Sequence, residues 1–81
     1  MRIAVQLFAV AKERAGKPSV ELELTPRATV ADLRRALAEQ VPALRGMIAQ
    51  LKFAVDQEYA ADDVEISPKS QVACIPPVSG G

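Results

Sequence analysis

The first residues of the chain alternate between apolar and polar side chains. Ile3, Val5 and Leu7 share one face of an extended segment, and Arg2 and Gln6 share the other. A period of two is typical of a strand with one buried face, so the pattern predicts a strand over residues 2–8. Residues 19–24 repeat the alternation and predict a second strand, antiparallel to the first.

Helical patterns occupy two segments. Residues 9–15 predict a short helix that ends at Gly16. A longer helix begins at Thr29, where a hydroxyl followed three residues later by Asp32 fits a capping box. Its apolar stripe has spacings of three and four, and Pro42 ends it. The stripe consists of Val30, Leu33, Leu37 and Val41. Arg34 and Arg35 are expected on the outer, solvated face.

The rest of the chain predicts further strands that complete a sheet with the first two. Residues 43–51 are expected to form a short helical turn or a packed loop. Residues 52–55 predict a third strand, and residues 59–60 and 64–66 predict short extended pieces. Residues 71–75 are almost continuously apolar, which predicts a central last strand buried on both faces.

This order of elements indicates an α+β fold with one main helix packed across one face of a mixed sheet. The ubiquitin-like β-grasp fold has this order. Its first and last strands run parallel at the centre, which would place Phe8 near Pro76. We therefore expect a single domain over residues 1–81, in which residues 76–81 form an extended C-terminal tail.

The charge balance limits the classes of partner. Ten Lys and Arg residues balance ten Asp and Glu residues. Nucleic-acid binding and electrostatic membrane binding need an excess of basic residues, so we expect neither partner. No segment approaches the eighteen apolar residues of a membrane span, and the N-terminus lacks a signal-peptide pattern. The expected location is cytoplasmic.

The chain contains one cysteine, Cys74, and no histidine. A single cysteine cannot form an internal disulfide, and zinc or copper sites of the usual kind are not expected. Triads that use histidine as the base are excluded. Cys74 could carry sulfur as a persulfide, but a small apolar residue inside a strand is the favoured interpretation.

The last six residues, Pro76-Pro77-Val78-Ser79-Gly80-Gly81, have an unusual composition. Prolines favour an extended backbone, so the segment is expected to project from the domain. Glycines have no side chain, and a Gly-Gly end could enter a slot that any side chain would block.

Several segments resemble the molybdopterin synthase small-subunit (MoaD) family. The most specific is Val72-Ala73-Cys74-Ile75 followed by the tail. Residues 7–9, 13–16 and 29–33 are similar to the same family. Two departures occur: Lys69-Ser70-Gln71 replaces a frequent Gly-Asp-Glu turn, and Cys74 stands where an aromatic residue is frequent.

The resemblance implies a role in molybdenum cofactor biosynthesis. An E1-like enzyme would adenylate Gly81 with ATP and Mg²⁺, and a sulfur-donating enzyme would convert it to a thiocarboxylate. Gly81 would then donate sulfur to cyclic pyranopterin in the large subunit of molybdopterin synthase. The residues expected to enter that active site are Pro76, Pro77, Val78, Ser79 and Gly80. The isolated chain would bind no cofactor and would not be an enzyme.

The same resemblance implies a heterotetramer with two large subunits at its centre. Phe8, on the polar face of the first strand, and Cys74 are candidates for the partner interface.

Three other functions stay open at this point. The chain could be a ubiquitin-like protein modifier that forms isopeptide bonds through Gly81. It could be a sulfur carrier for thiamine thiazole synthesis, although the Pro-Pro-Val-Ser segment argues against that. A purely structural interaction module would leave the tail unexplained.

Overall fold

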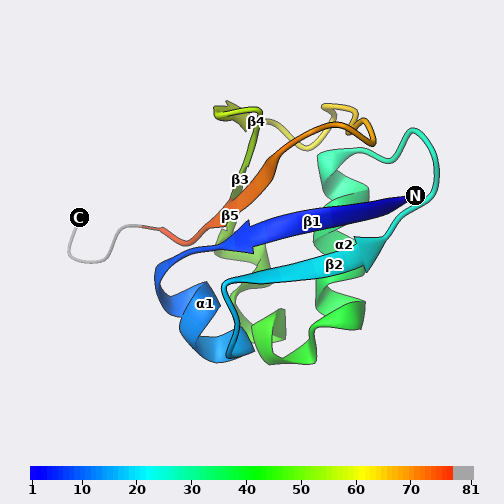
Figure 1. Ribbon diagram of the computed structural model, residues 1–81. Coiled ribbons are helices and arrows are strands. Elements are labelled where there is room, and N and C mark those ends of the chain that lie inside the picture. The colour runs from blue at the N-terminus through cyan, green and yellow to red at the C-terminus, as the bar shows by residue number, and fades with distance from the viewer. Residues whose placement is uncertain (78–81) are drawn as a thin grey trace.

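Residues 1–77 are described by the structure, a computed structural model (Figure 1). The elements follow in the order β1 (Arg2–Leu7), α1 (Ala9–Ala15), β2 (Ser19–Glu23), α2 (Val30–Gln40), the 3-10 helix η1 (Pro42–Gln50), β3 (Lys52–Val55), β4 (Glu58–Ala60) and β5 (Val72–Ile75).

The five strands form one mixed sheet in the order β2-β1-β5-β3-β4. β1 and β5 are parallel, and Leu7 pairs with Cys74. The other neighbouring strands are antiparallel. The sheet confirms the predicted α+β class and the predicted central place of the last strand.

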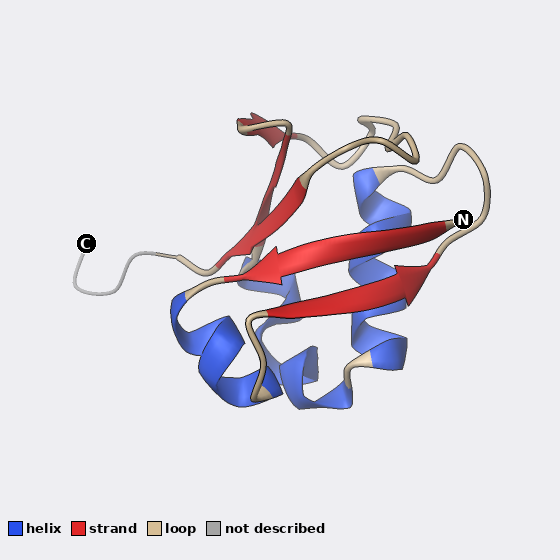
Figure 2. Cartoon of the chain, in the orientation of Figure 1, coloured by secondary structure: helices blue, strands red, loops and turns tan. Residues whose placement is uncertain are grey.

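The helices cover only one face of this sheet, and the other face has no second layer among the described residues (Figures 1 and 2). On β1, Ile3, Val5 and Leu7 point into the core, while the residues between them are exposed. The alternation of apolar and polar residues in the sequence therefore correctly predicts which side chains of β1 lie on the core face and which on the exposed face. The largest fully buried side chains include Phe53, Leu22, Leu33, Leu37, Leu44, Leu51 and Ile66.

Local capping fixes both α-helices as the sequence predicts. Gly16 ends α1 in the left-handed region at φ 75°, where glycine is favoured. At the start of α2, the Thr29 hydroxyl accepts from the backbone N–H of Asp32, and the Asp32 carboxylate accepts from the backbone N–H of Thr29. This capping box holds α2 across the sheet.

One expectation about β5 is wrong. Val72 and Cys74 are buried, but Ala73 and Ile75 are only half-buried. Alternate residues of a strand point to opposite faces, and the face that Ala73 and Ile75 share is not covered by helices. The nearly continuous apolar sequence of β5 therefore reflects one core face and one apolar outer face.

No helix within residues 1–77 has both the length and the apolar character needed to cross a membrane.

Candidate functional site

The tail begins at an edge of the sheet where two strand ends meet. β1 and β5 run parallel, so Phe8 and Ile75, the next residues after the Leu7–Cys74 pair, lie at the same edge. Phe8 is 46% exposed, whereas Pro76 is buried and Pro77 is exposed. Pro76 therefore anchors the root of the tail in the domain. The predicted site residues Val78, Ser79, Gly80 and Gly81 lie outside the described residues.

The uncovered face of the sheet is hollow beside Phe8. Alanines from three adjacent strands, Ala4, Ala73 and Ala54, contribute to the lining of a depression of about 570 Å³. Phe8 and Gln6 also line it. Small side chains flanked by an exposed aromatic ring leave room for the side chains of a partner. We call this surface, Ala4, Gln6, Phe8, Ala54 and Ala73, the open face.

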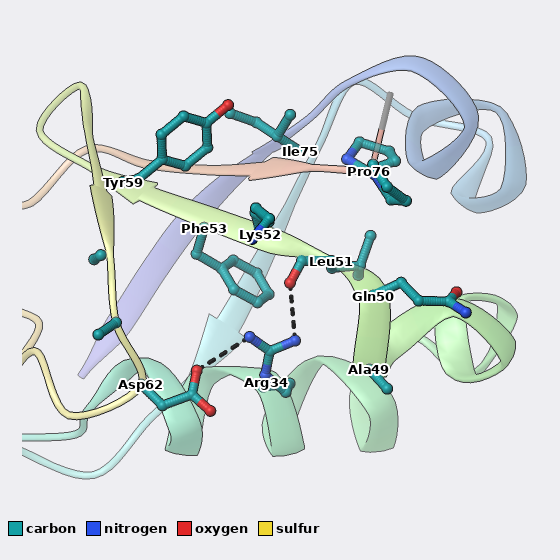
Figure 3. Close-up of a pocket in the computed structure, with 13 residues that line it drawn as sticks. Arg34, Ala49, Gln50, Leu51, Lys52, Phe53, Tyr59, Asp62, Ile75 and Pro76 are labelled. Carbon is teal, nitrogen blue, oxygen red and sulfur yellow. Dashed lines mark hydrogen bonds and ion pairs between the residues drawn. The ribbon is translucent and has the colours of Figure 1, made fainter. Parts of the chain in front are cut away.

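A second hollow, which we call the root groove, adjoins the start of the tail (Figure 3). It has a volume of about 980 Å³. Its lining comes from four parts of the chain, namely Arg34 of α2, the segment from Ala49 to Phe53, the segment from Tyr59 to Asp62, and Ile75, Pro76 and Pro77. The first two residues of the tail, Pro76 and Pro77, therefore lie along the wall of a groove.

Arg34 is not solvated on the outer face of α2, so that expectation is wrong. Its side chain is only 22% exposed and forms an ion pair with Asp62. Its guanidinium also donates to the carbonyl oxygens of Ile48 and Leu51, at 2.7 and 2.9 Å. Arg35, by contrast, is 72% exposed and pairs with Asp32, as expected for an outer position.

Cys74 is fully buried, with 0% of the residue exposed. This position contradicts its candidate role at the partner interface. The side chain lies on the core face of β5, where Cys74 pairs in register with Phe53 on one side and Leu7 on the other. Burial raises the pKa of its thiol to about 11, so the thiol is protonated at neutral pH and is a poor nucleophile.

The described residues contain no cluster of three or more His, Cys, Asp or Glu side chains that could hold a metal ion. The Asp32 carboxyl has a lowered pKa, chiefly because it accepts a hydrogen bond from the backbone of Thr29. That carboxyl belongs to the helix cap. What residues 1–77 place around the root of the tail is two hollows, the open face and the root groove.

Two site residues were missed by the sequence reasoning. Tyr59 is 70% exposed and lines the root groove, and Arg34 forms its floor (Figure 3). The signal for Arg34 is its place directly after Leu33, at the border of the apolar stripe. The signal for Tyr59 is an aromatic residue on a short strand flanked by turns.

The fold and the position of the tail root define a class, the ubiquitin-like β-grasp domains that present a C-terminal tail at the end of a central strand. The sequence matches the ThiS family over residues 5–81, and the chain belongs to this family. A molybdopterin synthase sulfur carrier subunit from Caenorhabditis briggsae is 36% identical, and the match covers 98% of this chain and 96% of the relative.

Solved structures agree with the fold. SAMP1 from Haloferax volcanii is similar with a TM-score of 0.88 and 29% identity, and the match covers 100% of both chains. A chain in the complex of subunits 1 and 2 of the molybdopterin-converting factor from Helicobacter pylori has a TM-score of 0.68 and 16% identity, again over 100% of both chains. The second likeness shows the fold alone.

Proposed function

We propose that this protein is the sulfur-carrier subunit of molybdopterin synthase, a small subunit that does not itself catalyse the reaction. The observation that supports this most directly is the 36% identity, over nearly the whole length of both chains, to a relative with that function. The fold supports it as well, because the ubiquitin-like β-grasp domain carries the root of the tail at the end of its central strand β5.

In the proposed reaction, Gly81 supplies the reacting atoms. An activating enzyme of the E1 type joins the Gly81 carboxylate to AMP from ATP, with Mg²⁺, and releases pyrophosphate. A sulfur-donating enzyme then displaces AMP and leaves a thiocarboxylate. The large subunit transfers that sulfur to cyclic pyranopterin monophosphate, and the Gly81 carboxylate is regenerated. Activation is needed because a carboxylate is a weak electrophile.

We assign docking of the large subunit to the open face and the root groove. Phe8 would insert as an exposed aromatic anchor, of the kind enriched at the centres of interfaces. Pro76 and Pro77 restrict the backbone before binding, which lowers the entropic cost of ordering the tail. A partner subunit is supported by the 36% identical relative, which is named as a subunit of molybdopterin synthase. A cytoplasmic location belongs to this proposal, because a lone cysteine fits a reducing compartment.

The decisive experiment is deletion of Gly81, with Lys69→Ala, a change in an exposed turn, as the control variant. The intact chain, incubated with the activating enzyme, ATP and a sulfur donor, should gain roughly 16 Da through exchange of oxygen for sulfur. The truncated chain should stay folded by circular dichroism and transfer no sulfur to the pterin. Pterin sulfuration by the folded truncation would refute the proposal.

The likeness to the small archaeal modifier protein 1 of Haloferax volcanii, at 27% identity, favours one second candidate, a protein modifier that forms isopeptide bonds through Gly81. This function is tested by mass spectrometry of cell proteins for Gly-Gly remnants on lysine. The control is a strain that expresses the chain without Gly81. The thiamine role is not favoured, since the curated relatives are molybdopterin synthase subunits.

A further inference from the structure

Arg34 lies beside the tail root without belonging to the tail. We propose that Arg34 is a positioning residue for sulfur transfer, which holds both walls of the root groove and so sets the direction in which Pro76 and Pro77 lead the tail toward the partner. This inference rests on the proposed function and adds a residue outside the tail to it.

The first wall is the junction between η1 and β3. The last carbonyl groups of a helix lack partners within the helix. Arg34 donates to two carbonyl oxygens at this end, those of Ile48 and Leu51, through one terminal nitrogen (2.7 and 2.9 Å). The Ile48 oxygen also accepts from the backbone N–H of Leu51. Lys52, the next residue, begins β3 and pairs with Ile75 of β5. Arg34 therefore fixes the point where β3 starts, directly opposite the last residue before the tail.

The second wall is the segment after β4. The other terminal nitrogen of Arg34 donates to a carboxylate oxygen of Asp62 at 3.1 Å. The Asp62 side chain is mostly exposed, and this ion pair turns its carboxylate toward Arg34 (Figure 3). The Asp62 carbonyl oxygen also accepts from the backbone N–H of Ala31 in α2. Since α2 carries Arg34, one side chain connects the helix layer to both walls.

A contact with Phe53 links Arg34 to β5 as well. The guanidinium carbon lies 5.1 Å from the centre of the Phe53 ring, within the range of a cation–π contact. Phe53 is buried and pairs in register with Cys74. Two residues after Cys74, Pro76 lines the root groove with Arg34. Displacement of the guanidinium would therefore shift Phe53 and its strand partner Cys74, which lies two residues before the start of the tail.

These contacts require an arginine. A guanidinium is planar and offers five donors in a fixed fork, whereas an ammonium is a compact point charge with three donors on a flexible chain. Arg34→Lys keeps the charge and loses the fork. A misplacement of about 1 Å at a reacting group can lower a rate about 100-fold, so a small change of direction at Pro76 is expected to be measurable.

The experiment compares Arg34→Lys with Arg35→Lys, the same substitution one residue later at an exposed position. Both chains are converted to the thiocarboxylate, and kcat and the KM for the carrier are measured with the large subunit. For Arg34→Lys we expect kcat to fall at least ~10-fold. KM is expected to change less than kcat, because the open face, which shares the docking with the root groove, is unchanged. Arg35→Lys should match the wild type in both constants.

A second measurement does not depend on sulfur chemistry. Amide hydrogen exchange of Lys52, Cys74 and Ile75 in the full chain alone should be faster in Arg34→Lys than in Arg35→Lys. If Arg34→Lys does not fold, Asp62→Asn, which weakens only the second wall, is used in both assays and should show a smaller loss of kcat.

Wild-type kcat in a folded Arg34→Lys chain would overturn the inference, as would a loss that merely follows the fraction of folded protein. If the wild-type chain itself transfers no sulfur, the proposed function fails. The exchange rates at Lys52, Cys74 and Ile75 then decide by themselves whether Arg34 holds the root of the tail.

Discussion

Replacing Phe8 with alanine tests the docking role of the open face. An aromatic side chain buries about 150–250 Å², so the 46% of Phe8 that is exposed leaves roughly 70–110 Å² for a partner to cover. At about 25 cal/mol per Å², covering this area contributes about 1.8–2.8 kcal/mol to binding. Loss of the ring is therefore expected to raise the Kd for the large subunit about 20- to 100-fold.

Isothermal titration calorimetry of the carrier with the large subunit measures this effect directly. The matched control is Val64→Ala, because Val64 is 37% exposed and lies beside the start of α2, to which its carbonyl oxygen is hydrogen-bonded. We expect the Kd of the control to stay within about 2-fold of wild type. If the Kd of folded Phe8→Ala for the large subunit rises by less than about 3-fold, the partner does not cover this ring and the open face loses its assigned role.

Four further results are expected. Thr29→Ala removes half of the capping box and should lower the free energy of unfolding by about 1 kcal/mol in a urea titration. Because the folded-state pKa of Asp32 is lowered, its contribution to stability is present at neutral pH and is lost as the pH falls below the usual aspartate range; Asp32→Asn should flatten that acid dependence in pH-dependent urea melts. In the β3–β4 turn, Asp56 and Gln57 have positive φ, at 52° and 72°. Glycine adopts such a φ without strain, so Gln57→Gly should raise the free energy of unfolding by about 0.5–1 kcal/mol, seen as a higher melting temperature. Native Cys74, with a pKa of about 11, should resist Ellman's reagent at pH 8 and react once the chain is unfolded in urea, and equal rates in both states would contradict its burial.

Features that depend on neighbouring residues could be predicted from the sequence. The alternation around Val5 separates core from surface because a strand has a period of two, and the capping box at Thr29 forms within four residues. The parallel pairing of β1 with β5 followed from the order of elements, which allows few arrangements of a sheet with one crossing helix.

Features that depend on distant contacts could not be predicted in the same way. Arg34 borders the apolar stripe of α2, and only the folded chain shows that the end of η1, the segment at Asp62 and Phe53 converge on it. Ala73 and Ile75 looked as apolar as Val72, since a local sequence does not reveal whether a second layer covers the sheet. Cys74 is small and apolar, so its residue type suited the core and an interface equally well.

The position of β5 also bears on how the domain assembles. β1 pairs with β2 and β3 pairs with β4, and within the described residues β5 is the strand that joins these two antiparallel pairs. Each pair closes over a short stretch of chain, whereas β5 must find β1 across more than sixty residues, between Val5 and Val72. Such non-local pairing is slow compared with hairpin closure. The step that completes the sheet therefore also fixes the root of the tail at Pro76, so the two parts of the molecule acquire their positions in the same folding event.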